Sequence, residues 1–130
     1  MPRTTVQPEV IVLTGKAGRA QAIRQALQSQ GVRTTQAASL DECQGRMDPS
    51  RPQLLILDSV TANLKWQQAW GVAQMAGVPM IAIVERFESR RWVELFKAGV
   101  LDVMSDPIPT HRLQMAVQDT FYGGSEREGG

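Results

Sequence analysis

Hydrophobic residues recur along the chain in two alternating patterns. Short uninterrupted apolar runs, as at 10–13, 54–57 and 80–84, are typical of strands that are buried on both faces. Between these runs, apolar residues recur three or four positions apart, which is typical of amphipathic helices. The pattern therefore predicts five strand–helix units in succession. The expected strands are 9–13, 32–37, 53–57, 79–84 and 101–105, and the expected helices are 19–30, 40–47, 64–75, 90–98 and a last one that follows residue 109.

Residues with strong conformational preferences mark several of the expected helix ends. Ser39 followed three positions later by Glu42 is the capping-box signature of a helix start. Gly31 is predicted to end the first helix as a C-terminal cap. Thr110 is expected to cap the last helix, which the glycines at 123–124 would end.

Short buried strands separated by helices indicate a parallel sheet, because parallel connections need a crossover. The predicted class is α/β, a doubly wound sheet of five parallel strands with helices on both faces. In such sheets the functional crevice lies beyond the carboxyl ends of the strands, where the strand order reverses. The candidate segments are therefore 14–18, 58–60, 84–86 and 105–107.

Length and charge narrow the function classes. At 130 residues the chain has room for one hydrophobic core. We expect an N-terminal arm over 1–8, one domain over 9–122 and a Gly-rich tail or linker over 123–130. The 14 basic residues nearly balance the 13 acidic ones, which argues against binding of nucleic acid or of an anionic membrane. No apolar run is long enough to span a membrane and no secretory signal is visible, so a cytoplasmic location is expected.

The residues at the strand ends resemble those of receiver domains from bacterial two-component response regulators, across about residues 9–122. Asp58, after the third strand, resembles the aspartate that accepts the phosphoryl group. The segment Ala-Gly-Val-Leu-Asp-Val-Met-Ser-Asp-Pro at 98–107 resembles the receiver segment Ala-Gly-Ala-Asp-Asp-Tyr-Leu-Val-Lys-Pro. The fourth strand begins at a proline, as it does in that family. The resemblance implies a flavodoxin-like, receiver-type fold and a role in phosphorelay signal transduction.

Other residues occupy the positions that hold Mg²⁺ and phosphate in that family. By the resemblance, Thr14 and Gly15 replace two acids, Val84 replaces a hydroxyl residue, and Asp106 replaces a lysine. The last replacement reverses a charge: at an effective dielectric near 20, two unit charges about 4 Å apart interact by roughly 4 kcal/mol. We therefore predict a degenerate receiver, or pseudo-receiver, without a cofactor. A Mg²⁺ site would need a geometry that the family does not use.

Two carboxylates at one crevice require a cation or a raised pKa. Lys16 in the first loop and Arg86 in the fourth loop could each reach Asp58 and Asp106. We hypothesise that one of them pairs with these carboxylates and holds the domain in one state. In the alternative interpretation both cations are solvated and Asp58 caps its loop.

Three further features carry weaker signals. The segment from Gly15 to Gly18 lacks the spacing of a nucleotide-binding loop, so its glycines are expected to allow a tight turn, although an anion or nucleotide remains an alternative ligand. His111 has no partners for a triad or a metal cluster, so we predict no catalytic residues and no enzyme. Cys43 is expected to be a reduced, half-buried thiol without a role.

The fourth and fifth helices carry the predicted partner face. The resemblance to receiver domains implies that Val93 and Phe96 face the sheet, which turns Trp92 toward solvent or a partner. An exposed tryptophan is a typical interaction anchor. We predict that Trp92, Glu94 and Arg112 contact a protein partner: a histidine kinase, an output domain, or a second copy through these helices. The alternatives are a receiver that accepts phosphate on Asp58, and a small anion-binding protein.

Overall fold

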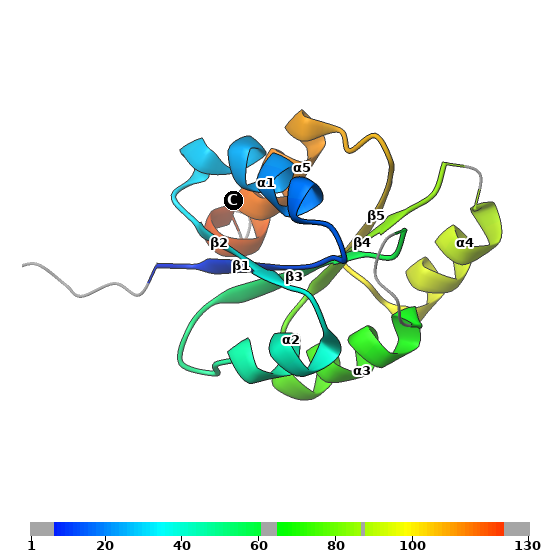
Figure 1. The fold of residues 1–130 in the computed structure, drawn as a ribbon, viewed down its shortest axis with the longest axis horizontal. Coiled ribbons are helices and arrows are strands. Elements are labelled where there is room, and N and C mark those ends of the chain that lie inside the picture. The colour runs from blue at the N-terminus through cyan, green and yellow to red at the C-terminus, as the bar shows by residue number, and fades with distance from the viewer. Residues whose placement is uncertain (1–6, 61–64, 87, 124–130) are drawn as a thin grey trace, which may run out of the picture.

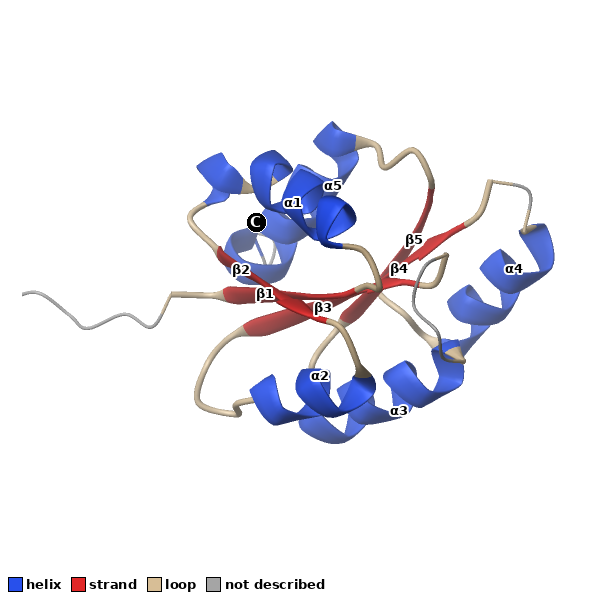
Figure 2. Ribbon diagram, viewed as in Figure 1, coloured by secondary structure: helices blue, strands red, loops and turns tan. Residues whose placement is uncertain are grey.

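The computed structural model describes residues 7–60, 65–86 and 88–123, in which five parallel strands form one sheet in the order β2-β1-β3-β4-β5. Helices cover both faces of this sheet (Figures 1 and 2), which confirms the predicted doubly wound class. The strands are β1 (Glu9–Leu13), β2 (Arg33–Ala37), β3 (Gln53–Asp58), β4 (Met80–Val84) and β5 (Asp102–Ser105). The helices are α1 (Ala17–Ala26), α2 (Leu40–Arg46), α3 (Trp66–Ala76), α4 (Ser89–Ala98) and α5 (Thr110–Gln118), with short segments η1 (Gln28–Gln30) and η2 (Asp119–Gly123).

The sheet separates two hydrophobic layers. Helices α1 and α5 lie together on one face, and α2, α3 and α4 lie on the other (Figure 1). Neighbouring residues of β1 point to opposite layers: Val10 and Val12 pack with α1 and α5, whereas Ile11 and Leu13 pack with the other helices. Successive side chains of a strand alternate between faces, so a strand that is apolar at every position is buried on both sides.

The crevice lies beside β1, the strand at which the order of the sheet reverses. β1 pairs with β2 on one side and with β3 on the other, and Leu13 faces Leu57 in the β1–β3 ladder. This register brings the next residues, Thr14 and Asp58, side by side beyond the carboxyl ends of their strands.

The predicted cap at Ser39 is confirmed, whereas Gly31 caps the short segment η1 rather than α1 itself. The Ser39 side chain accepts a hydrogen bond from the Glu42 backbone N–H, and Gly31 adopts a left-handed conformation (φ 72°). The first helix is shorter than predicted, because Leu27 leaves helical geometry and a 3₁₀ turn follows. The prediction for Thr110 was wrong: it is the first helical residue, after Pro109, and makes no capping bond.

Helix α4 is rotated about its own axis relative to the prediction, so that a different side of it faces the sheet. Leu95 is fully buried and Trp92 packs, half-buried, against the α2–α4 core layer. Val93 and Phe96 are instead 51% and 46% exposed. The helix therefore buries its Trp92–Leu95 side and presents two apolar residues on the surface.

Several predictions lie outside the described residues. These are most of the N-terminal arm, the tail beyond residue 123 and the start of the third predicted helix at Leu64. In the part of the chain that the structure describes, no helix has the length and apolar character needed to cross a bilayer.

Candidate functional site

Asp58, the last residue of β3, is the centre of the candidate site. Its side chain is fully buried, and both carboxylate oxygens accept hydrogen bonds. The Thr14 hydroxyl donates to Oδ2 over 2.8 Å, and the Val60 backbone N–H donates to Oδ1 over 3.2 Å. A buried carboxylate is stable in its charged form only when donors and a countercharge compensate for the lost water.

Arg19 supplies that countercharge. Its Nε lies 3.2 Å from Oδ2 of Asp58, and its Nη1 lies 2.6 Å from Oδ1 of Asp106. The Arg19 side chain is only 15% exposed, so its guanidinium is held at the crevice rather than in solvent. One residue of α1 therefore joins the end of β3 to the segment that follows β5.

The hydrogen bond between Arg19 and Asp106 shifts the pKa values of these two groups in opposite directions. The hydrogen bond to Asp106 holds the pKa of Arg19 above its ordinary value, with a further contribution from the charge of Asp58. The same hydrogen bond lowers the pKa of Asp106 below its usual range, although this carboxylate is 44% exposed. Both groups are thus charged at neutral pH.

The cation that the structure places between the two carboxylates is Arg19, which the sequence analysis did not name. The ion pairs that the structure gives for Asp58 and Asp106 are those of Arg19, whereas Lys16 and Arg86 are exposed. Lys16 contributes only its backbone N–H, which donates to the Thr14 hydroxyl over 3.2 Å. Arg19 lies in the first turn of α1 and directly follows the candidate segment 14–18.

The residues at the four altered receiver positions have different roles. Thr14 is fully buried and holds Asp58 through its hydroxyl, whereas Gly15 is exposed. Val84 is fully buried in the core, and its carbonyl accepts the Asp106 N–H. Asp106 reaches the crevice through Arg19 and precedes Pro107 in a cis peptide bond.

This arrangement does not fit a Mg²⁺ site. Magnesium requires near-octahedral oxygen ligands, of which carboxylates are the strongest. Here the guanidinium of Arg19 lies against both Asp58 and Asp106, so a dication would meet a fixed positive charge. Among the described residues no three His, Cys, Asp or Glu side chains are arranged to hold a metal.

The loop between β1 and α1 is simpler than expected. Helix α1 already begins at Ala17, so Gly18 belongs to its first turn. The described glycines with positive φ are Gly31, Gly77 and Gly99, so the turn at Gly15 and Gly18 does not use the left-handed conformation. The space beside Gly18 is open, and a Cβ at this position would meet no atom within 4 Å.

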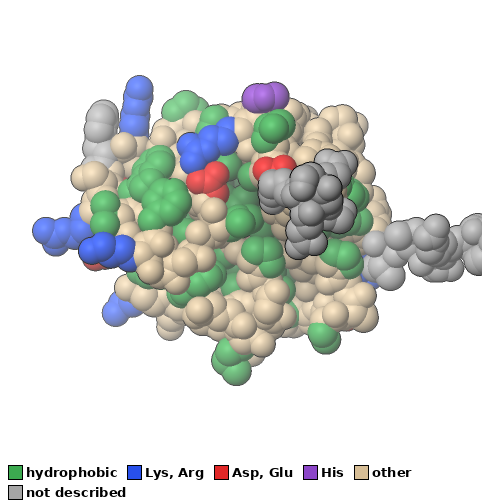
Figure 3. Space-filling view, turned by 180° about the vertical axis from the view of Figure 1, so that it is seen from behind, with side chains coloured by type: hydrophobic (Ala, Val, Ile, Leu, Met, Phe, Trp, Pro, Cys, Tyr) green, Lys and Arg blue, Asp and Glu red, His purple; other side chains and the backbone are tan. Residues whose placement is uncertain are grey.

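Two other candidate residues, His111 and Cys43, make no described contact with Asp58, Arg19 or Asp106. His111 is exposed at the start of α5, and the single histidine is visible at the rim of the molecule in Figure 3. Cys43 is a free thiol, fully buried rather than half-buried as predicted. Burial raises the pKa of this thiol to about 11, so it is a poor nucleophile.

The predicted partner face has a different composition from the one expected. Glu94 is exposed, and Arg112, 47% exposed, pairs with Asp102 over 2.6 Å. Trp92 is the residue that was misplaced. The large apolar side chains that α4, β5 and α5 expose at this side, and that the sequence analysis did not select, are Val93, Phe96, Leu101 and Met115.

The opposite view of the molecule shows how apolar surface is distributed. In Figure 3 hydrophobic side chains reach the surface as several patches separated by polar and charged groups. Leu101 and Met115 line a shallow pocket together with Arg112 and residues of α5 and η2. Leu101 and Met115 therefore border a hollow rather than a flat surface.

Comparison with known proteins identifies the fold. No protein-family profile matches the chain, and no curated protein matches its sequence. A signal receiver domain of a putative LuxO repressor protein from Vibrio parahaemolyticus is similar, with a TM-score of 0.78 and 18% identity over 95% of this chain and 96% of that one.

Two further solved structures agree with it. A signal receiver domain of an HD domain-containing protein from Pseudomonas fluorescens gives a TM-score of 0.77 at 15% identity, over 98% of this chain and 97% of that one. A response regulator receiver domain from Clostridium thermocellum gives 0.77 at 14% identity, over 93% and 97%. The fold of this chain is that of response regulator receiver domains.

Proposed function

We propose that this receiver-fold chain is a signalling module that acts by protein–protein contact without a phosphoryl group on Asp58. The observation that carries the proposal is the Arg19 guanidinium, which lies against both Asp58 and Asp106. The function is thus that of a binding domain in two-component signal transduction, not of an enzyme.

The geometry around Asp58 disfavours phosphorylation. An acyl phosphate forms when a carboxylate oxygen attacks phosphorus, which requires an accessible oxygen with an available lone pair. Here Oδ2 accepts from Thr14 and Arg19, Oδ1 accepts from the Val60 N–H, and the side chain has no exposed surface. A phosphoryl donor would have to reach a buried carboxylate beside the Arg19 guanidinium and displace hydrogen bonds at the attacking oxygen.

Arg19 also supports a single fixed state. In receiver domains, by the resemblance described above, a metal ion and a lysine connect the loops around the acceptor aspartate. In this chain Arg19 connects α1, the end of β3 and the segment after β5 through charge-assisted hydrogen bonds. Such a connection needs no ligand, so the module would present one surface at all times.

The surface available for contact is the side formed by α4, β5 and α5. Val93 and Phe96 of α4 are about half exposed, as are Leu101 and Met115 nearby. Exposed apolar residues rimmed by charged ones, here Glu94 and Arg112, are typical of interaction sites. Histidine kinases, output domains and a second copy of the chain are the partner classes that the resemblance implies.

The absence of phosphotransfer can be tested by mass. The chain would be incubated with acetyl phosphate and Mg²⁺ and its intact mass measured, alongside Asp58→Asn. We expect no stable gain of a phosphoryl group in either protein. A gain in the wild type that Asp58→Asn lacks would overturn the proposal and assign phosphorelay chemistry to Asp58.

The contact surface can be tested with a matched pair of variants. Phe96→Ser removes an apolar group from the α4 side, and Met75→Ser removes one that is 92% exposed on α3. We expect the wild type and Met75→Ser to capture the same proteins from the native cell. Phe96→Ser should not capture these proteins. Identical capture by all three proteins would contradict the proposed surface.

A further inference from the structure

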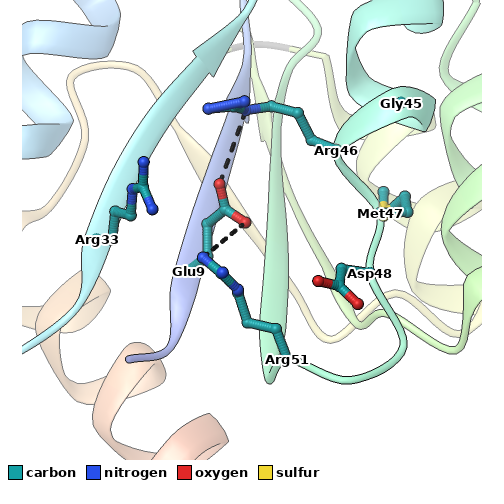
Figure 4. A pocket seen from close by; sticks show the side chains of 7 residues that line it. All are labelled: Glu9, Arg33, Gly45, Arg46, Met47, Asp48 and Arg51. Carbon is teal, nitrogen blue, oxygen red and sulfur yellow. Dashed lines mark ion pairs between the residues drawn. The ribbon is translucent and has the colours of Figure 1, made fainter. Parts of the chain in front are cut away.

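A second cluster of charged residues lies at the opposite end of the sheet from Asp58. Residues Glu9, Arg33 and Gln53 begin β1, β2 and β3, so their side chains meet at the amino-terminal edge of these strands. A cavity of about 320 Å³ opens there (Figure 4). Its lining residues are Glu9, Arg33, Gly45, Arg46, Met47, Asp48 and Arg51.

The floor of the cavity is a buried polar network. Glu9 and Gln53 are only 4% and 5% exposed. The Glu9 carboxylate accepts a hydrogen bond from Gln53 Nε2 over 2.9 Å and another from the Thr35 hydroxyl over 2.8 Å, one at each oxygen. Gln53 also donates to the Arg46 carbonyl and accepts from the Asp48 N–H, so the network fixes the loop after α2.

Three arginine side chains surround this floor, and among the described residues no guanidinium hydrogen-bonds to Glu9 or Gln53. Arg46 and Arg51 approach the Glu9 carboxylate from two sides (Figure 4), at 3.7 Å and 4.0 Å, which are ion-pair distances longer than a hydrogen bond. The buried Nε of Arg51 has no partner among the described residues. Arg33 makes no ion pair with any residue that the structure describes.

The carboxylates around the cavity do not balance its arginines, so positive charge and hydrogen-bond donors remain in excess. Three guanidiniums face two carboxylates, and Asp48 already accepts hydrogen bonds from the backbone N–H and the hydroxyl of Ser50. Both Glu9 oxygens are engaged as well. Planar guanidiniums match the oxygen geometry of phosphate and carboxylate groups, and arginine predominates where such anions are recognised.

We propose that this cavity binds a small anion that carries a phosphate group. Arg33 and Arg51 donate to the phosphate oxygens, with Arg46 nearby, while the buried Glu9 network keeps the arginines together despite their mutual repulsion. A water molecule occupies about 30 Å³ in the liquid, so 320 Å³ leaves room for a substituent beside the phosphate. The site is independent of Asp58 and goes beyond the proposed function, since it adds a ligand to a contact module.

Arg33→Gln is the sharpest test, because this side chain is exposed and its loss breaks no described ion pair. Arg46 is less suitable, since a cation in the last turn of α2 also stabilises the helix. Isothermal titration calorimetry would use inorganic phosphate, pyrophosphate and phenyl phosphate in a chloride buffer of constant ionic strength. Arg90→Gln, an exposed residue of α4 with the same change of charge, is the matched control.

We expect saturable binding that Arg33→Gln and Arg51→Gln each weaken by at least about tenfold, the scale of one charge-assisted hydrogen bond. Arg90→Gln should change the affinity by less than about twofold, and Arg33→Gln should retain the wild-type melting temperature. Tighter binding of phenyl phosphate than of inorganic phosphate would identify a phosphate ester as the ligand; the reverse would identify the free ion.

Two results would overturn the proposal. One is that no probe gives a saturable heat of binding at concentrations up to about 10 mM. A dissociation constant of about 1 mM corresponds to a binding free energy of roughly 4 kcal/mol, so such binding would be detected in this range. The other is an equal loss of affinity in Arg33→Gln and Arg90→Gln, which would show a general effect of net charge. The acetyl phosphate experiment on Asp58 reports on the other end of the sheet, so failure of either proposal is distinguishable from failure of the other.

Discussion

Arg19 Nη1 lies 2.6 Å from Asp106 Oδ1, although the two residues are 87 positions apart in the chain. The contact joins the first helix to the segment after the last strand. Through Nε the same guanidinium also reaches Asp58, at the end of the central strand β3. Arg19 therefore links three parts of the sequence at the crevice.

Removing the Arg19 charge should destabilise the fold. Arg19→Gln leaves the buried Asp58 carboxylate without its countercharge, and loss of a hydrogen bond to a charged group costs about 1.5–3 kcal/mol. We expect the free energy of unfolding, measured by urea denaturation, to fall by that amount. Arg112→Gln, which breaks the more exposed ion pair with Asp102, should cost less than about 1 kcal/mol.

A double-mutant cycle identifies the cause of that loss. Asp58→Asn removes the buried charge, so Arg19→Gln should cost much less in the Asp58→Asn background than in the wild type. Equal costs in both backgrounds would show that Arg19 stabilises the protein by packing rather than through the Asp58 charge.

Asp106 should titrate below an ordinary aspartate. Its pKa is lowered chiefly by the hydrogen bond from Arg19, relative to an unfolded value of about 3.9. This pair therefore contributes stability above that value and loses it as the pH falls through the lower pKa of the folded state. A carboxyl ¹³C NMR titration should show the depressed midpoint, and Arg19→Gln should raise it toward the ordinary value.

The two apolar sides of α4 should differ in their effect on stability. Leu95→Ala empties a fully buried position and should cost about 2–5 kcal/mol in urea denaturation. Phe96→Ser changes a residue that is 46% exposed, and its cost should stay near 0.5 kcal/mol. Similar losses for both variants would contradict the observed rotation of α4.

The Cys43 thiol should be almost inert in the folded chain. With a pKa of about 11, about one thiol in a thousand is ionised at pH 8, against about one in four for an ordinary thiol. Alkylation by iodoacetamide should therefore be at least a hundredfold slower than in urea-unfolded protein. Since the raised pKa belongs to the folded state, this thiol also lowers stability as the pH rises from about 9 to 11.

The strand–helix order could be predicted because it depends on local patterns. Short, fully apolar runs such as 54–57 are typical of strands buried on both faces, and glycine adopts the left-handed conformation seen at Gly31 with little steric cost. The end of α1 was less predictable, because the apolar Leu27 continues the helical spacing after the backbone has left helical geometry.

The need for a cation at the crevice could be predicted, but not its source. The carboxylates at the end of β3 and after β5 had to be compensated, and Lys16 and Arg86 were chosen because they lie in the first and fourth loops at the strand ends. Arg19 is selected instead because the first turns of α1 carry its long side chain back over the strand ends. A cation directly after the segment 14–18, at the start of the first helix, was the available signal.

The rotation of α4 could not be read from periodicity. Trp92 with Leu95 and Val93 with Phe96 are both apolar pairs three positions apart, and they lie on adjacent sides of the same helix. Packing against the α2–α4 core layer selects the first pair. The Glu9 network was also missed, since a single acid at a strand start has no partner visible in the sequence.

The pairing of β1 with β3 has a consequence for both ends of the molecule. The ladder that sets Leu13 opposite Leu57 also sets Glu9 opposite Gln53. A slip of one residue would turn the Asp58 carboxylate away from Thr14 and, at the same time, separate Glu9 from the amide that holds it. The crevice and the arginine cavity thus depend on the same alignment of β1 with β3. A change in that alignment would disrupt both sites together.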